Sequence, residues 1–178
     1  MGLNFQQEHE AELMDIVDEN DVPIGTAMRP DIYRDLPLHR IVHGMLFDAS
    51  GRFILQLRSA KKAYKPLHWV TAVSGHPRAG ETYEQAAHRE GEEELGASLV
   101  FLNFRRLFYI DAERPALRRF LGVLEAQFDG IFTLNADEVE SVKTVKREEL
   151  QGMLQDPTEK FHPELRAILV ELYGFVVK

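Results

Sequence analysis

The alternation of hydrophobic and polar positions predicts that the first half of the chain consists mainly of strands. Residues 14–25 (MDIVDENDVPIG) have the pattern of a strand, a polar turn and a second short strand. Residues 40–57 (RIVHGMLFDASGRFILQL) place an apolar run and an alternating run on either side of the turn DASG, which is typical of a β-hairpin. Residues 68–75 (HWVTAVSG) predict one further short strand that runs into a glycine.

The next segment has the start and stop signals of a helix. Thr82 is a suitable N-cap, and Gln85, three residues later, completes a capping box. Gly96 follows the last turn, where a residue that readily adopts positive φ is favoured. We therefore expect a helix between Thr82 and Gly96.

The second half continues with strands and ends with helices. Residues 98–110, 118–128 and 138–145 read as strands. Two apolar stripes with helical spacing follow, formed by Leu150, Met153 and Leu154 and by Leu165, Ile168, Leu169 and Leu172. This order of elements predicts an α/β fold in which a mixed β-sheet lies between helices.

Length and composition narrow the class of protein. At 178 residues we expect one domain over residues 13–178, preceded by a tail over residues 1–12. The net charge of −8 argues against a nucleic-acid partner, which calls for a basic surface. The chain has no cysteine, no secretory signal and no apolar run of about 18 residues. These features predict a cytoplasmic protein without a membrane partner.

An unusual concentration of negative charge lies in residues 75–97 (GHPRAGETYEQAAHREGEEELGA). Glu90, Glu93 and Glu94 stand at positions i, i+3 and i+4 of the predicted helix, so they share a face and repel one another. Each such pair costs roughly 0.2–0.5 kcal/mol in an isolated helix. Mg²⁺, with Mn²⁺ as an alternative, would cancel this repulsion, because both are hard cations that favour carboxylate ligands. The other interpretation is a solvated acidic face, as in most such runs.

The spacing around these acids resembles the signature of the Nudix hydrolases. Gly75, Glu81, Arg89 and Gly96 all stand at the required offsets from the three glutamates. One position departs from the family pattern, because Gly91 replaces the usual aliphatic residue. A glycine inside a helix costs about 1 kcal/mol relative to alanine, so we expect it to mark close packing against the sheet.

The resemblance implies roles for individual residues. Glu90, Glu93 and Glu94 would bind the metal, together with the carbonyl group of Ser74. The resemblance further implies that Arg89 orients a carboxylate, Glu81 supports the junction between loop and helix, Gly75 allows a tight turn and Gly96 ends the helix. Two residues are candidates for the general base, namely Glu90 and Glu138, although Glu138 also fits a solvated turn.

Residues 37–81 also resemble the type I isopentenyl-diphosphate isomerases, a branch of the Nudix superfamily, and this resemblance covers residues 15–97 well and 98–150 weakly. His39 and His76 fall where that branch has metal-binding histidines, and Arg58 and Lys62 fall where it binds diphosphate. Ser74, however, replaces the catalytic cysteine. A third metal-binding histidine and an acidic pair are also missing. All the acids of the Nudix signature are retained, which favours a hydrolase on an isomerase-like scaffold.

Several of these residues keep a second interpretation. His39 and His76 form either a second metal site or ordinary histidines at strand ends. Arg58 and Lys62, with Lys61 and Lys65, bind phosphate or lie in a solvated loop. Tyr64 and Trp69 stack on a base or, as is usual for a tryptophan beside a strand, belong to the core. Of Arg118 and Arg119, one should face inward, toward a phosphate or a carboxylate.

The sequence therefore predicts a Nudix pyrophosphohydrolase that uses Mg²⁺ to cleave a diphosphate linkage. The expected partner is a small phosphorylated substrate, most simply a nucleoside di- or triphosphate or a derivative of a nucleoside diphosphate. Two alternatives remain, namely an isopentenyl-diphosphate isomerase or other prenyl-diphosphate enzyme, and a non-catalytic nucleotide-binding module. Because dimers are common in the family that the chain resembles, the resemblance also implies a homodimer as one possible state.

Overall fold

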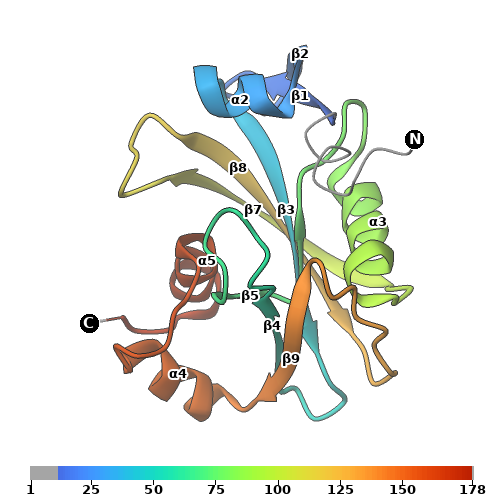
Figure 1. Cartoon of the computed structure of the whole chain (residues 1–178), viewed down its shortest axis with the longest axis vertical. Helices are drawn as coiled ribbons and strands as arrows, with labels where there is room; N and C mark the ends of the chain where they lie inside the picture. The colour runs from blue at the N-terminus through green and yellow to red at the C-terminus, as the bar shows by residue number, and fades with distance from the viewer. Residues whose placement is uncertain (1–11, 178) are drawn as a thin grey trace.

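A computed structural model describes residues 12–177 and contains two β-sheets and four helices (Figure 1). Strands β1 (Leu13–Val17) and β2 (Pro23–Met28) form a small antiparallel sheet, and helix α2 (Arg29–Asp35) follows directly. Of the predicted tail, all but Glu12 lies outside the described residues, and Glu12 is buried.

The main sheet has seven strands of mixed direction. The central pair, β3 (His39–Phe47) and β8 (Arg118–Gln127), is parallel, and the other pairings are antiparallel. The remaining strands are β4 (Phe53–Arg58), β5 (Trp69–Thr71), β6 (Val73–Gly75), β7 (Phe101–Ile110) and β9 (Val139–Val145).

The sheet divides beside the β3–β4 hairpin, and this division creates the place for the site. Strands β3 and β4 pair only through Leu46 with Ile54 and Phe47 with Phe53. Beyond these pairs, β5 takes over the edge of β4, and β6 takes over the edge of β3. The predicted single strand over residues 68–75 is therefore two short strands, because its two halves bond to different neighbours.

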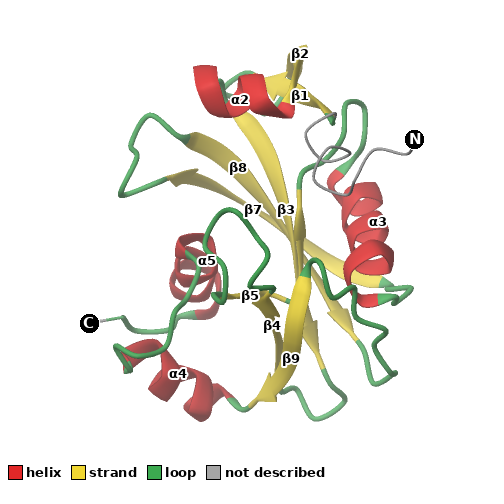
Figure 2. Ribbon diagram, viewed as in Figure 1, coloured by secondary structure: helices red, strands yellow, loops and turns green. Residues whose placement is uncertain are grey.

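Helices cover both faces of the main sheet, as predicted (Figure 2). Helix α3 (Tyr83–Leu95) packs on one face, where its Ala86 and Ala87 meet Val42 and Leu124. Helices α4 (Arg147–Gln155) and α5 (Pro163–Tyr173) pack on the other. The predicted stripes of both helices are buried in one apolar cluster with β3, β4 and β8, except for the partly buried Leu172.

Local sequence signals gave most of these elements, but not α2. This helix has seven residues and buries only Ile32, so it has no apolar periodicity to detect. Its position depends on contacts with distant segments instead. Among these contacts is an ion pair of 3.3 Å between Arg29 and the buried Glu12.

The buried Asp21 joins the turn between β1 and β2 to the main sheet. Its carboxylate accepts hydrogen bonds from Arg40 Nε at 2.7 Å, Arg106 Nη1 at 2.8 Å and the Tyr83 hydroxyl at 3.1 Å. Its φ of 67° lies in the left-handed region, which asparagine also tolerates. Asp21 is thus a structural centre where three segments meet.

Replacing Asp21 with asparagine should destabilise the fold without changing its backbone. Asp21→Asn removes the negative charge between two guanidinium groups, which should lower the free energy of unfolding by about 2 kcal/mol. For a chain of this size, that corresponds to a fall in Tm of roughly 4–8 °C. Thermal unfolding should show this fall, whereas Asp137→Asn, at an exposed ion pair with Lys61, should change Tm by less than about 2 °C. Equal effects of the two variants would contradict this role of Asp21.

Candidate active site

Helix α3 carries the acidic stretch, and its two ends form as the sequence predicts. Thr82 and Gln85 make both hydrogen bonds of the capping box, and Gly96 ends the helix with φ at 60°. Gly91 is closely packed, as expected, but against a different partner. A Cβ atom there would lie 2.9 Å from Leu99 Cδ1, in the segment after the helix, so the expectation of packing against the sheet was wrong.

The three glutamates of the stretch do not share one environment. Glu90 and Glu94 are buried, at 6% and 4% exposure, and both line a cavity. The amide of Ser74 donates to Glu94 Oε2 at 3.2 Å, which ties strand β6 to the helix. The side chain of Glu93 is 39% exposed and lies outside the cavity lining.

Gly75 is required for space and not for a turn. It lies in β6, and its backbone is not among those with positive φ in the described chain. A Cβ atom at this position would lie 2.0 Å from Glu90 Oε1 and 2.1 Å from its Cδ atom. The carboxylate of Glu90 therefore rests directly on the Gly75 backbone, which corrects the expected role in a tight turn.

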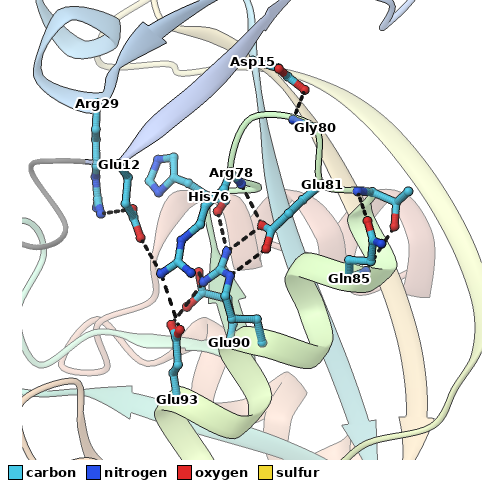
Figure 3. Close-up of polar contacts among 12 residues, drawn as sticks. Glu12, Asp15, Arg29, His76, Arg78, Gly80, Glu81, Gln85, Glu90 and Glu93 are labelled. Atoms are coloured by element: carbon cyan, nitrogen blue, oxygen red, sulfur yellow. Dashed lines mark hydrogen bonds and ion pairs between the residues drawn. The ribbon is translucent and has the colours of Figure 1, made fainter.

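Arg89 holds the carboxylates around it in fixed positions. It donates to both oxygens of Glu81 at 2.9 Å, to Glu90 Oε1 at 2.8 Å and to Glu93 Oε2 at 3.1 Å. A further bond of 3.0 Å reaches the carbonyl oxygen of His76, just after β6 (Figure 3). Glu81 also accepts from the Arg78 amide at 2.8 Å, so loop and helix are bound together.

Burial shifts two acids of the cavity, Glu90 and Glu94, toward their neutral forms. It raises the pKa of Glu90 to about 7, although the charge of Arg89 opposes the shift. Burial, and after it the charge of Glu90, raises the pKa of Glu94 to about 8. Two buried carboxyl groups that repel one another in this way form a favourable place for a divalent cation.

These shifts predict how Mg²⁺ should stabilise the protein at different pH values. Between the ordinary pKa of 4.5 and the raised values, the folded state holds protons that the unfolded state has lost, so metal-free stability falls as pH rises. A cation needs the ionised forms. The difference in Tm between Mg²⁺ and EDTA should therefore grow from pH 6.5 to pH 8.5. Thermal scans of the Glu90→Gln/Glu94→Gln double variant should show no such growth, and a constant difference in the unmodified protein would contradict the assignment.

A cavity of about 320 Å³ opens between the two parts of the main sheet. It is strongly charged, because five basic side chains and four carboxylates contribute to its wall. The basic residues are Arg29, Arg58, Lys62, Arg114 and Arg119, and the acids are Glu90, Glu94, Glu138 and Glu164. The expected residues Arg58, Lys62, His76, Ser74 and Glu138 are thus brought together with Glu90 and Glu94.

Arg58 is the cation of this wall that the protein compensates least. Its guanidinium donates to the carbonyl oxygens of Tyr64 and Lys65, at 3.1 Å and 3.2 Å. Within residues 12–177 no carboxylate lies within ion-pair distance of it. Lys62, by contrast, forms an ion pair with the buried Glu138. An anionic ligand would supply the negative charge that pairs with the guanidinium of Arg58.

His39 and His76 are close, but they differ in their access to the cavity. Their rings stack with centroids 6.2 Å apart, and His76 Nε2 lies 2.7 Å from the hydroxyl of Tyr33. His39 is fully buried, outside the cavity lining, and burial lowers its pKa to about 4. Its Nδ1 atom donates to the carbonyl oxygen of Pro37 at 2.9 Å, which fixes the neutral ring.

Glu90 and Glu94 are the two buried carboxylates of the cavity that could hold a cation such as Mg²⁺. In the described part of the chain, no three acidic or histidine side chains are gathered closely enough to hold an ion. His39 and His76 likewise have no third acidic or histidine side chain close enough to complete a metal site with them in the described residues. Mg²⁺ usually takes one or two carboxylates and completes its shell with water and phosphate oxygens. The two buried carboxylates therefore suffice, and Glu93 lies at the edge of this arrangement.

The structure adds cavity residues that the sequence did not indicate as functional. His43 and Glu164 are buried in the wall and lie 3.3 Å apart, although they come from strand β3 and helix α5, which are far apart in the sequence. Arg119 is the inward-facing arginine of the pair at 118 and 119, and its Nε lies 3.0 Å from Glu164 Oε1. Trp69 belongs to the core, as the alternative interpretation had it. Only the alternation along β8 gave a signal for any of these positions.

Comparisons with known proteins agree with this fold. The family model described as the NUDIX domain matches residues 37–167. Isopentenyl-diphosphate Delta-isomerase 2 from Photorhabdus laumondii is 31% identical over 158 residues, which cover 84% of this chain and 86% of that protein. The uncharacterized Nudix hydrolase PA4841 from Pseudomonas aeruginosa is 33% identical over 139 residues, with 78% and 81% coverage.

A solved structure extends the similarity to nearly the whole chain. The crystal structure of DR0079 from Deinococcus radiodurans superposes with a TM-score of 0.74 at 26% identity and covers 91% of this chain and 99% of that one. The chain belongs to the Nudix family. Its curated relatives include both hydrolases and isomerases by name. No helix among the described residues is long and apolar enough to cross a membrane.

Proposed function

We propose that this protein is a Mg²⁺-dependent hydrolase that cleaves the diphosphate linkage of a nucleoside di- or triphosphate or of a nucleoside diphosphate derivative. One observation carries the proposal. Two buried carboxyl groups with raised pKa values, Glu90 and Glu94, share a cavity with Arg58, a half-buried arginine whose guanidinium has no carboxylate partner in the described chain. The two carboxyl groups could bind a cation, and Arg58 could bind the phosphate oxygens that the cation also contacts.

In this proposal Glu90 and Glu94 hold the cation, and Ser74 contributes its carbonyl group. The bound cation would neutralise negative charge on the phosphate oxygens, which makes phosphorus more open to attack, and it would stabilise the leaving oxygen. Arg89 keeps the carboxylate of Glu90 in place, and Arg58 binds phosphate oxygens. A water molecule attacks phosphorus, the bond from phosphorus to the bridging oxygen breaks, and a glutamate accepts the proton of the water.

We assign the proton acceptor to Glu138. Glu90 would be occupied by the cation in this proposal. Glu138 lines the same cavity, and its charge contributes to the raised pKa of Glu94, so it lies close to the metal site. Lys62 forms an ion pair with Glu138 and so holds its carboxylate at the cavity wall.

The Glu138→Gln variant can distinguish a general base from a metal ligand. Glu138→Gln should lower kcat by about 10²–10³-fold, a range typical of a lost general base. Its affinity for Mn²⁺, measured by titration calorimetry, should stay within about twofold of the unmodified protein, since Glu138 is not a ligand. A variant with normal kcat would return the role to Glu90.

A phosphate-release screen tests the function itself. The purified protein is incubated with nucleoside di- and triphosphates, dinucleotides, nucleotide sugars and isopentenyl diphosphate, with and without Mg²⁺. We expect Mg²⁺-dependent release from one of the nucleotide classes. Isomerisation of isopentenyl diphosphate without hydrolysis would favour the activity by which several relatives are named. Binding of nucleotides without turnover of any compound would favour a non-catalytic module.

A further inference from the structure

A second cluster of buried polar groups lines the cavity, and the proposed chemistry does not use it. Glu164 is the centre of this cluster. Arg119 Nε lies 3.0 Å from its Oε1 atom, and His43 Nε2 and His162 Nδ1 lie 3.3 Å and 3.6 Å from its Oε2 atom. Arg58 is within electrostatic reach of both Glu94 and Glu164, so the cluster and the proposed metal site belong to one binding space.

The local sequence FHPE fixes two of these groups firmly. His162 is the N-cap of α5, Pro163 occupies the first turn, and Glu164 follows in that turn, where a negative charge is favoured. The His162 amide donates to the Trp69 carbonyl oxygen at 2.9 Å, and the Trp69 amide donates to the Lys160 carbonyl oxygen at 2.7 Å. The start of α5 is therefore bonded to β5.

The hydrogen bonds of His43 are constrained as well. The Thr71 hydroxyl donates to the carbonyl oxygen of Val73 at 2.7 Å, so toward His43 it must accept. The His43 Nδ1 atom, 2.9 Å away, is therefore the donor of that bond. The Nε2 atom then faces Glu164, and this wall is held from β3, β5, β8 and α5 at once.

Despite these short distances, the cluster leaves hydrogen-bonding capacity unused. Arg119 Nε, Glu164 Oε1, His43 Nε2 and His162 Nδ1 are buried and have no hydrogen-bond partner of good geometry among the described residues. More than about 90% of buried polar groups in proteins are satisfied, so four exceptions at one cavity wall require an explanation. A ligand that offers both a donor and an acceptor would satisfy the carboxylate and the guanidinium together.

We propose that Arg119 and Glu164 recognise the nucleobase of the substrate through an edge that pairs a donor with an acceptor. This inference rests on the proposed function, which places the diphosphate at Glu90, Glu94 and Arg58. The cavity wall suits a base and not a prenyl chain, because its only aliphatic side chains among the described residues are Ile41 and Val70.

Planar groups at the cavity support this assignment. The ring of Tyr64 lies 5.0 Å from the Arg114 guanidinium and packs edge-on against His162, with ring centroids 5.6 Å apart. Tyr64 and Arg114 both line the cavity and are partly exposed. Aromatic rings and guanidinium planes are the groups on which bases stack.

Titration calorimetry with non-hydrolysable ligands tests the assignment independently of turnover. In the presence of Mg²⁺, the α,β-methylene analogues of ADP, CDP, GDP and UDP are compared with methylenediphosphonate, which carries no base, and with the corresponding isopentenyl analogue. We expect one nucleotide to bind most tightly. Glu164→Gln should raise the Kd for that nucleotide about tenfold, as expected for the loss of a charge-assisted hydrogen bond. It should leave the Kd for methylenediphosphonate unchanged. Glu171→Gln, at an exposed position of the same helix, is the matched control.

A second variant guards against misfolding. Arg119→Met/Glu164→Leu replaces the buried pair by apolar groups, which proteins often tolerate. Thermal unfolding checks that it folds, and it should bind the isopentenyl analogue at least as tightly as any nucleotide. The proposal is overturned if Glu164→Gln weakens the binding of methylenediphosphonate as much as that of the nucleotide. It is also overturned if the double variant keeps the nucleotide preference, or if the unmodified protein binds no nucleotide more tightly than the isopentenyl analogue. Failure of the proposed function would appear separately, as nucleotide binding without phosphate release.

Discussion

Glu94→Gln is expected to lower kcat for the preferred diphosphate roughly 10³-fold, which corresponds to about 4 kcal/mol of lost transition-state stabilisation. Glutamine keeps the size of the side chain and an oxygen that can accept from the Ser74 amide. It removes the charge that would attract the cation. Because Glu94 is buried and its pKa is raised to about 8, the neutral side chain should also leave the fold intact or stabilise it.

The measurement for Glu94 is steady-state phosphate release over a series of Mg²⁺ concentrations. The loss should lessen in part when Mg²⁺ is raised, since the remaining ligands still bind weakly. Glu92→Gln, two residues away on the same helix and exposed, should keep kcat within about twofold. If the two variants behaved alike, Glu94 would not be a ligand of the catalytic cation.

The second large effect is expected at Gly75, which carries no chemistry of its own. Gly75→Ala would place a Cβ atom 2.0 Å from Glu90 Oε1, a distance that no real contact allows. Glu90 must then move away from the backbone, and its bond of 2.8 Å with Arg89 should be disturbed. We expect kcat to fall about 10²-fold, as for other displacements of about 1 Å in an active site.

Gly25→Ala provides the control for this variant. Gly25 also lies in a strand, but a Cβ atom there would meet nothing within 4 Å. Its kcat should be unchanged. A crystal structure of Gly75→Ala should show the carboxylate of Glu90 displaced from β6. Normal activity, or a displaced Glu90 without loss of activity, would contradict the importance of its position.

Local signals made much of the fold predictable from the sequence. The capping box at Thr82, the left-handed Gly96 and the turn before Phe53 are each decided by a few neighbouring residues. The apolar stripes of α4 and α5 likewise reflect burial directly. Residues 68–75 were less predictable, because hydrogen bonds to two different strands decide where that segment breaks.

Helical spacing also explains what the sequence could and could not say of the acids. Successive residues are about 100° apart around a helix, so Glu93 and Glu94 lie about 60° and 40° to opposite sides of Glu90. The edge of the cavity falls between them. Spacing alone could not tell which of the two would be buried, and the structure places Glu94 inside and Glu93 at the surface.

The Glu164 cluster could not be found from the sequence at all. Its members come from β3, β8 and the start of α5, and His43, Arg119 and Glu164 are each more than 40 residues apart in the sequence. Each taken alone resembles an ordinary histidine or an ordinary helix-start acid. Only the topology of the sheet, with β3 and β8 as parallel neighbours, brings His43 and Arg119 to the same wall.

Anomalous scattering from a crystal soaked in Mn²⁺ tests the central claim most directly. We expect a manganese peak about 2 Å from the carboxylate oxygens of both Glu90 and Glu94, on the side that faces the cavity, and no peak there in the Glu90→Gln/Glu94→Gln protein. A well-ordered peak elsewhere, such as between His39 and His76, with none beside these two glutamates, would contradict the account.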